Sequence, residues 1–323
     1  MDNTVEPSSP TSKIEQVIAA VKNAMIGQDQ VLEEVLITIV AGGHVLLEGV
    51  PGLGKTLLAR ALSKALHMKF GRIQFTPDLM PSDVTGHAMY DSQSGTFKIR
   101  KGPIFTNLLL GDEINRAPAK TQASLLEAMQ ERQVTIEGKS FVLPPPFIVI
   151  ATQNPIESEG TYPLPEAQLD RFLCKVLINY PSLEEETRLT QSVLDNSVGN
   201  DFDLERVKPV ITAEELVAVQ QKAAEVRIDA QVHSYAVQIA QATRTWQGFS
   251  VGCGPRGSIS LLRAARAYAY IDQRDFVTPD DIKRVTLPAL RHRVILAPEM
   301  EIEGVNTDSM LLELLSTVEA PRT

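Results

Sequence analysis

The chain has 323 residues, of which 43% are hydrophobic and 22% are charged, a composition typical of a soluble globular protein with room for two domains. The net charge of −9 argues against a general nucleic-acid-binding surface, and the two cysteines, Cys174 and Cys253, are too few for a disulfide framework and lack metal-ligand spacing. No apolar run reaches the ~18 residues of a membrane span, and the polar first residues lack a signal-peptide core, so we expect a cytoplasmic protein.

The first part of the chain predicts a tail and two helices. Residues 1–12, which contain Pro and Ser, are expected to form a disordered tail. Apolar residues at helical spacing then predict one helix over 13–24 and a second around 31–39. The turn between them contains Ile26 and Gly27, which are candidates for the wall of an adenine pocket or for ordinary core packing.

The strongest signal is the stretch that follows the short apolar strand 45–47. Its glycines, lysine and threonine have the spacing of a phosphate-binding loop, G-x-x-x-x-G-K-[ST]. The glycines let backbone N–H groups wrap a phosphate, and the helix expected from Lys55 adds the positive end of its dipole. Lys55 is expected to reach the β- and γ-phosphates of ATP, and the Thr56 hydroxyl to bind Mg²⁺. The predicted nucleotide-binding residues of this loop are Gly49, Pro51, Gly52, Leu53, Gly54, Lys55, Thr56 and Leu57.

The next segment predicts a second strand at 70–75 and then a region with few periodic runs. Within that region, residues 88–90 and 96–99 resemble the two arms of a hairpin that turns at 91–95. We expect an exposed insertion, either with a role of its own or as a plain surface loop.

Two further strands end in polar side chains. Strand 108–111 leads into Asp112, a candidate Mg²⁺ ligand, and Glu113, a candidate base for activating water. Strand 147–152 leads into Asn154, which would lie near a γ-phosphate or an attacking water, or would simply form a turn before Pro155. Because parallel strands end at one edge of a sheet, we expect these groups to meet there.

The rest of the chain adds a hairpin, a last strand and a helical region. The hairpin is expected at 134–143 and the strand at 173–178; just before that strand, Arg171 could pair locally with Asp170. Capping signals that begin at Ser182, Thr212 and Thr278 predict helices, with a linker or hinge at 196–209. The apolar run 310–315 is expected to be a closing lid helix rather than a partner-binding segment.

Arg256 follows Pro255 at the predicted start of a helix. A cation there opposes the helix dipole, so its placement makes sense if it faces an anion such as a nucleotide phosphate.

With these motifs in place, residues 13–300 resemble the MoxR family of AAA+ ATPases. The most specific stretches are LLEGVPGLGKT, GDEINRAP, LLEAMQERQVTIEG, ATQNP, PEAQLDRF and GPRGSISLLRAARA. The resemblance implies an α/β fold, in which a P-loop NTPase core with a five-stranded parallel sheet flanked by helices spans 13–181. A linker and an all-α lid domain are then expected over 182–323.

The resemblance also implies a role for each motif. Within one protomer it implies Lys55 and Thr56 as Walker A, Asp112 and Glu113 as Walker B, Asn154 as sensor 1, and Arg256 as sensor 2. Gln74 would restrain Glu113, and Arg171 would act as an arginine finger on the nucleotide of a neighbouring protomer. The segments 83–104 and 134–143 resemble the helix-2 insert and the presensor hairpin, which would line a ring pore or its face.

Finally, the resemblance implies an ATP- and Mg²⁺-dependent ring, commonly a hexamer, that remodels client proteins, often with a von Willebrand factor A domain partner. Three alternatives remain open: a DNA-translocating motor, a chelatase-type subunit for metal insertion, and a nucleotide-gated scaffold without useful turnover. The acidic chain and a hairpin tip with Glu137 and a single Lys139 make nucleic acid an unfavoured partner.

Overall fold

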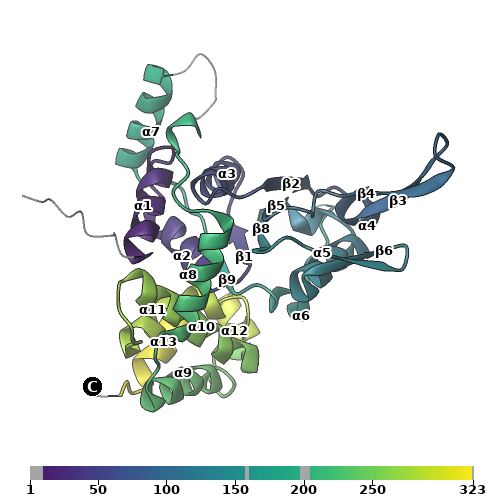
Figure 1. Ribbon diagram of the computed structural model, residues 1–323. Helices are drawn as coiled ribbons and strands as arrows, with labels where there is room; N and C mark the ends of the chain where they lie inside the picture. The colour runs from purple at the N-terminus through teal and green to yellow at the C-terminus, as the bar shows by residue number, and fades with distance from the viewer. Residues whose placement is uncertain (1–9, 157–159, 197–203, 322–323) are drawn as a thin grey trace, which may run out of the picture.

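The computed structural model describes residues 10–156, 160–196 and 204–321. At its centre, five parallel strands form one sheet in the order β2–β5–β8–β1–β9, which confirms the predicted five-stranded parallel sheet (Figure 1). The strands are β1 (Val45–Glu48), β2 (Phe70–Gln74), β5 (Leu108–Asp112), β8 (Ile148–Gln153) and β9 (Cys174–Leu177).

Apolar side chains alternate between the two faces of this sheet, as the two-residue period of a strand requires. In β1, Val45 and Leu47 join one hydrophobic cluster and Leu46 joins the other. Both faces are therefore buried, which explains why the strands are near-continuous apolar runs in the sequence.

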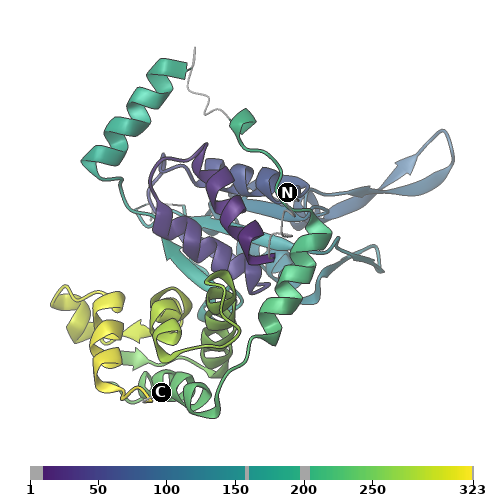
Figure 2. The ribbon, with the colours of Figure 1, turned by 60° about the vertical axis from the view of Figure 1, so that its left-hand side comes forward.

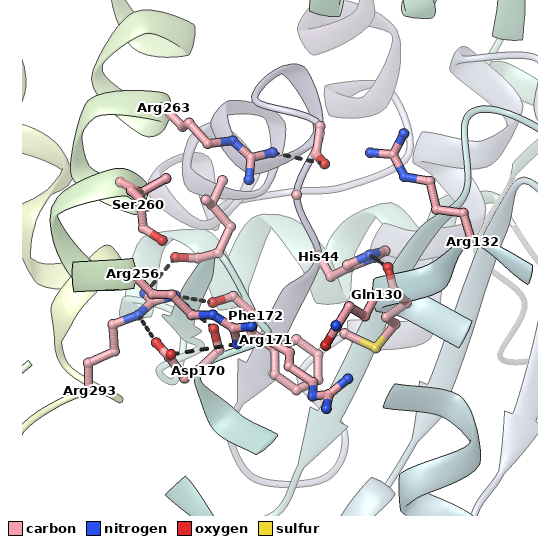
Figure 3. Close-up of a pocket in the computed structure, with 15 residues that line it drawn as sticks. His44, Gln130, Arg132, Asp170, Arg171, Phe172, Arg256, Ser260, Arg263 and Arg293 are labelled. Carbon is pink, nitrogen blue, oxygen red and sulfur yellow. Dashed lines mark hydrogen bonds and ion pairs between the residues drawn. The ribbon is translucent and has the colours of Figure 1, made fainter. Parts of the chain in front are cut away.

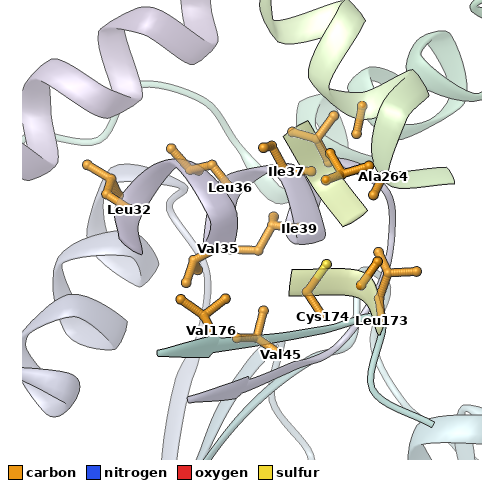
Figure 4. Packing of buried hydrophobic residues seen from close by; sticks show 14 of the residues in the cluster. Leu32, Val35, Leu36, Ile37, Ile39, Val45, Leu173, Cys174, Val176 and Ala264 are labelled. Atoms are coloured by element: carbon orange, nitrogen blue, oxygen red, sulfur yellow. The ribbon is translucent and has the colours of Figure 1, made fainter. Parts of the chain in front are cut away.

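Helices cover both faces of the sheet. The first face packs against α2, whose Val35 and Ile39 lie over Val45 and Val176 (Figure 4). The second face packs against α5, through Leu125 and Leu126. The helices of this part of the chain are α1 (Pro10–Lys22), α2 (Asp29–Val40), α3 (Lys55–Ala65), α4 (Pro81–Thr85), η1 (Ile114–Arg116), α5 (Ala119–Glu131) and α6 (Glu166–Leu169). Because α1 begins at Pro10, the predicted tail over 1–12 is wrong for its last three residues; residues 1–9 lie outside the described part of the chain.

Two antiparallel hairpins project from the same side of the sheet (Figure 1). They are formed by β3 (Gly86–Asp91) with β4 (Thr96–Lys101), and by β6 (Gln133–Ile136) with β7 (Lys139–Val142). Both occur where the sequence predicts them. The β3–β4 hairpin carries exposed Tyr90 and Phe97, whose rings meet edge to face at 5.3 Å.

The second part of the chain is mainly helical. Helix α7 extends away from the sheet (Figure 2), and the later helices pack together below the sheet as a lid (Figure 1). The helices are α7 (Leu183–Asn196), η2 (Leu204–Arg206), α8 (Ala213–Glu225), α9 (Ala230–Ala242), α10 (Pro255–Ile271), α11 (Pro279–Leu290), α12 (Pro298–Ile302) and α13 (Thr307–Thr317).

The lid follows its sequence signals closely, with one exception. Thr212 and Thr278 cap α8 and α11 with both reciprocal hydrogen bonds of a capping box. Leu311 and Leu314 of α13 are fully buried, which supports the lid-helix interpretation of 310–315. The exception is a short antiparallel ladder of β10 (Phe249–Val251) and β11 (Ile295–Leu296), which the sequence signals do not indicate; the rest of the described lid is helical, as predicted.

The predicted linker at 196–209 includes residues 197–203, which lie outside the described residues. Among the described helices, none is both long enough and apolar enough to cross a membrane.

Candidate functional site

The carboxyl ends of β5 and β8 and the start of α3 enclose a cavity of about 380 Å³. The described residues that line it are Pro51, Gly52, Gly54, Lys55, Thr56, Leu57, Arg60, Asp112, Glu113, Asn154 and Leu204. The parallel sheet therefore gathers the phosphate loop, both carboxylates and Asn154 at one edge, as the sequence predicts.

Three glycines shape the loop for two different reasons. Gly52 and Gly54 have left-handed φ angles of 85° and 79°, and a Cβ built on either would meet no atom within 4 Å. Their conformation, rather than a lack of space, requires glycine. Gly49 is required by close packing, since a Cβ there would lie 2.7 Å from the carbonyl oxygen of Ile178.

The Lys55 ammonium lies among backbone oxygens at the head of α3. Its Nζ donates to the carbonyl of Gly49 and, at 3.2 Å, to that of Gln153. Burial lowers the pKa of Lys55, while the carboxylates of Asp112, Glu113 and Glu48 oppose this shift. The loop thus holds a cation at the point where a phosphate chain would meet the helix N-terminus.

A buried threonine joins the Asp112 carboxylate to the backbone of Glu113. The Thr152 hydroxyl donates to Asp112 Oδ1 at 2.7 Å and accepts from the backbone N–H of Glu113 at 2.8 Å. Glu113 adopts a left-handed φ of 57°, unusual for a residue with a Cβ. Thr152 therefore fixes the backbone turn that aims the Glu113 side chain.

Side chains from β2 and from the turn after β5 bind the carboxylate oxygens of Asp112 and Glu113 that Thr152 does not contact. Gln74 Nε2 donates to Glu113 Oε2 at 2.8 Å, and Arg116 Nη1 approaches the same oxygen at 3.2 Å. Arg72 Nη2 donates to Asp112 Oδ2 at 2.7 Å and to the Gln74 side chain at 3.1 Å. The contact between Gln74 and Glu113 is the one that the restraining role of Gln74 requires.

Asn154 lies at the end of β8, where its side chain is 5% exposed and its Oδ1 accepts from the backbone N–H of Ile156 at 3.2 Å. This is the turn contact expected of an Asn before proline. Asn154 also lines the cavity, so the turn and a role at the cavity are compatible.

The two predicted arginines lie in a different cavity of about 340 Å³ between the core and the lid (Figure 3). Arg171 and Arg256 line it together with Arg132 and Arg263. Arg256 Nη1 is 3.7 Å from Asp170 Oδ2. The lid places Arg256 beside Arg171, in a cavity whose described lining does not include Lys55, so the action of Arg256 on its own protomer's nucleotide stays a prediction.

Four other predicted residues do not line the Lys55 cavity. Gly49 acts through its carbonyl, and Leu53 packs against the main hydrophobic cluster. Ile26 and Gly27 also lie outside the described lining, and a Cβ on Gly27 would be 2.9 Å from the Glu185 side chain. The role of Ile26 and Gly27 as an adenine wall therefore stays a prediction, beside the alternative of ordinary core packing.

The sequence interpretation missed Arg60, Arg72, Thr152 and Leu204. Arg72 and Gln74 alternate with the buried Ile73 on β2, a two-residue pattern that could have suggested both. The apolar run around Thr152 predicts only that it lies in a strand. Leu204 reaches the cavity from η2, far along the chain, and no local pattern indicates this.

The donor groups at the cavity fit Mg·ATP. The open space beside Gly52 and Gly54 accommodates phosphates, and the Thr56 hydroxyl with the Asp112 carboxylate is a suitable oxygen set for Mg²⁺, which usually keeps several waters. Among the described residues, no group of three or more His, Cys, Asp or Glu side chains is arranged to hold a metal ion.

A five-stranded parallel sheet that joins a phosphate loop to paired carboxylates, followed by a helical lid, defines a nucleotide-binding AAA+ ATPase. Residues 44–174 match the family model described as ATPase family associated with various cellular activities, and residues 241–314 match that of the AAA lid domain. The chain is 40% identical to Chaperone MoxR1 of Mycobacterium tuberculosis, over 96% of this chain and 82% of that protein. The chain belongs to the MoxR family of AAA+ ATPases.

Other relatives agree with this family. Uncharacterized protein YeaC of Bacillus subtilis is 45% identical, over 95% of this chain and 94% of YeaC. A crystal structure from Cytophaga hutchinsonii, provisionally named an ATPase, superposes with a TM-score of 0.89 at 40% identity, covering 97% of this chain and 96% of that one. Magnesium-chelatase subunit ChlI of Nostoc is more distant, at 26% identity over 92% of this chain and 90% of ChlI.

Proposed function

We propose that this chain hydrolyses Mg·ATP between adjacent protomers of a ring and uses the cycle to remodel client proteins. The observation that carries the proposal is the division of the catalytic groups between two cavities. Lys55, Glu113 and Asn154 line one cavity, whereas Arg171 and Arg256 line another in the same chain. A complete site then needs two copies of the chain, each supplying one half.

Within one protomer, the phosphate loop binds the substrate. Backbone N–H groups around Gly52 and Gly54 and the start of α3 hold the phosphates, and Lys55 exchanges its carbonyl partners for β- and γ-phosphate oxygens. Thr56 and Asp112 would hold Mg²⁺, which when bound neutralises developing charge on the phosphate oxygens.

Glu113 is the proposed general base. Its carboxylate accepts the proton of the water that attacks the γ-phosphorus, while Asn154 orients that water or the phosphate. The hydrogen bond from Gln74 at 2.8 Å holds Glu113 to one side, so its release is a natural point of control.

The neighbouring protomer supplies the second half. Five arginines, Arg132, Arg171, Arg256, Arg263 and Arg293, line the core–lid cavity, and Asp170 is the acidic residue among its described lining. Such a surface suits a polyphosphate. We assign Arg171 the role of arginine finger, worth roughly 10³ to 10⁵ in rate, and Arg256 a supporting role on the same neighbouring nucleotide.

The remodelling role rests on the relatives and the family. MoxR1 is named a chaperone, and the family resemblance implies a hexameric ring with a client and a von Willebrand factor A domain partner. The buried free thiols Cys174 and Cys253 suit a reducing cytoplasm, and burial raises the pKa of Cys174 to about 11. A chelatase-like role is the second candidate, because ChlI is related over most of its length.

Phosphate release from ATP tests the proposal. Wild-type protein should hydrolyse ATP, and Lys55→Ala should lose both nucleotide binding and turnover. Lys120→Ala, which changes an exposed lysine on α5, is the matched control and should behave as wild type. Absence of turnover in the wild-type ring, with binding intact, would favour a nucleotide-gated scaffold instead.

Client capture addresses the biological role. Glu113→Gln protein with ATP should retain client and partner proteins that wild type releases. Stimulation of turnover by a porphyrin with partner subunits would instead favour the chelatase candidate, and stimulation by DNA would favour a DNA motor.

A further inference from the structure

A buried arginine of the lid holds the segment that contains Arg171. Arg293 follows α11, and its side chain is 3% exposed at the boundary between lid and core (Figure 3). A guanidinium has five N–H donors. In this structure each nitrogen of Arg293 has at least one partner, and four of the contacts go to residues 170–173 of the core.

The contacts lie on both sides of Arg171. Arg293 Nε donates to Asp170 Oδ1 at 2.7 Å, and Nη2 donates to the carbonyls of Asp170 at 3.3 Å and Phe172 at 2.6 Å. Nη1 donates to the carbonyl of Leu173 at 3.0 Å and to that of Ala289 in α11. The backbone around Arg171 is thereby fixed to the lid rather than only to its own strand.

Two further contacts extend this connection. His292 Nε2 donates to the carbonyl of Phe172 at 3.1 Å, and the free oxygen of Asp170 lies 3.7 Å from Arg256 Nη1. Asp170 therefore lies between Arg293 and Arg256. On the core side, Arg171 Nη1 donates to the carbonyl of Leu126 in α5 at 2.9 Å.

We propose that Arg293 is a positioning residue that makes the lid and the Arg171 segment one mechanical unit. A displacement of the lid then moves the Arg171 guanidinium, which acts on the nucleotide of the neighbouring protomer. This inference rests on the proposed action of Arg171 across the interface, and it adds the route by which the lid of one protomer sets the turnover of the next.

Arg293 could instead be only an anchor between lid and core, and Arg291 provides the comparison. Arg291 is nearly as buried, with a side-chain exposure of 7%, and it also bridges lid and core. Its guanidinium binds the Asp308 carboxylate through two nitrogens and donates to the carbonyl of Lys175 at 3.1 Å. Arg291 therefore has the same charge and similar burial, but its hydrogen bonds go to Asp308 and Lys175 and not to residues 170–173.

The test compares Arg293→Lys with Arg291→Lys. Lysine keeps the charge but donates from a single nitrogen, so it cannot bond at once to Asp170 before Arg171 and to Phe172 and Leu173 after it. Arg293→Lys should lower kcat for ATP at least tenfold with little change in KM, while Arg291→Lys should keep kcat within about twofold of wild type. Equal losses of kcat in the two variants would overturn the proposal.

Two further measurements separate positioning from a general loss of structure. In an Arg171→Ala background, Arg293→Lys should cause no further loss of kcat, because its effect passes through Arg171. Mixing Arg293→Lys with Glu113→Gln protomers should restore turnover, since each supplies the half that the other lacks. A full additional loss in the Arg171→Ala background, or no restoration on mixing, would contradict the inference.

The pair of Arg171→Ala and Glu113→Gln protomers, mixed in the same way, is the reference. If that pair regains turnover and the Arg293→Lys pair does not, the inference fails while the proposed function stands. If neither pair regains turnover, action across the interface itself fails. Should Arg293→Lys not fold, Asp170→Asn tests the same connection by removing the carboxylate that Arg293 and Arg256 share.

Discussion

Thr152→Val tests whether ATP turnover depends on how Asp112 and Glu113 are positioned, because it leaves both carboxylates in place and removes only a hydroxyl that holds these two residues. Valine has nearly the same shape as threonine, and Thr152 is fully buried, so packing should change little. What is removed is the hydroxyl that donates to Asp112 at 2.7 Å and accepts from the Glu113 amide at 2.8 Å.

The expected cost follows from these two bonds. A hydrogen bond to a charged group contributes about 1.5–3 kcal/mol, and leaving a buried amide unsatisfied costs about 1–3 kcal/mol. Asp112 keeps its contact with Arg72. The lower part of each range is therefore appropriate, and the free energy of unfolding should fall by about 3 kcal/mol.

Turnover should fall as well. Glu113 has a left-handed φ of 57°, a conformation that costs a residue with a Cβ about 1–2 kcal/mol. Without the Thr152 hydroxyl the turn can relax and swing the carboxylate away, while Lys55 and the phosphate loop are unchanged. We therefore expect turnover to fall by about tenfold or more, within the range of a general base, with ATP binding retained.

Urea unfolding, nucleotide titration and phosphate release measure the three quantities. Thr152→Ser is the matched control, because it keeps the hydroxyl and loses only a methyl group, and it should retain most of the turnover. If Thr152→Val hydrolyses ATP at the wild-type rate, Glu113 does not depend on this bond and the assigned geometry is wrong.

Three other predictions concern residues of the Lys55 cavity and His44, which lines the core–lid cavity. Glu113→Gln should retain ATP but lose turnover by roughly 10²- to 10⁴-fold in a phosphate-release assay, whereas Glu131→Gln, an exposed change outside the cavity, should not. In Gly54→Ala the new Cβ meets open space, but the alanine must adopt a left-handed φ of 79°, which costs about 1 kcal/mol. Nucleotide titration should therefore give an affinity about fivefold or more below that of wild type. Burial lowers the pKa of His44 from 6.5 to about 4, so the folded chain binds this proton less readily than the unfolded chain. The resulting contribution to the free energy of unfolding is fully present above pH 6.5 and is lost as the pH falls toward 4. Urea unfolding between pH 7 and 4 should therefore show wild type losing about 3 kcal/mol more than His44→Gln, and equal slopes would refute this.

The sequence predicts the catalytic edge well because its signals are local. Each strand is a short apolar run, and the chemistry follows directly after it, at Gly49 to Thr56, at Asp112 with Glu113 and at Asn154. Once the strands are parallel, their ends must meet, so the convergence of these groups needs no further information.

The position of the lid depends instead on packing between distant segments. One hydrophobic cluster joins α2, strands β1 and β9, and the lid helices, with Ala264 of α10 beside Ile37 of α2 (Figure 4). No local pattern encodes that arrangement. The sequence predicts that Arg256 lies at the start of a helix, as α10 confirms, but which nucleotide it could reach depends on where α10 lies.

Contacts between strands explain the other omissions. Arg72 lies beside Asp112 because β2 pairs with β5. Thr152 reaches the Asp112 carboxylate and the backbone N–H of Glu113 because β8 pairs with β5 on its other side. These residues act through neighbours about 40 positions away in the chain. A linear motif therefore contains the groups that we propose to touch ATP and omits the side chains that position those groups.

Mixing two inactive variants tests the central claim most directly, namely that one ATP is split by groups from two chains. Arg171→Ala protomers keep Lys55 and Glu113, and Glu113→Gln protomers keep Arg171. Each alone should bind ATP and release phosphate slowly, and an equimolar mixture should recover a substantial part of wild-type turnover. A mixture that hydrolyses ATP no faster than the average of its two components would contradict the account.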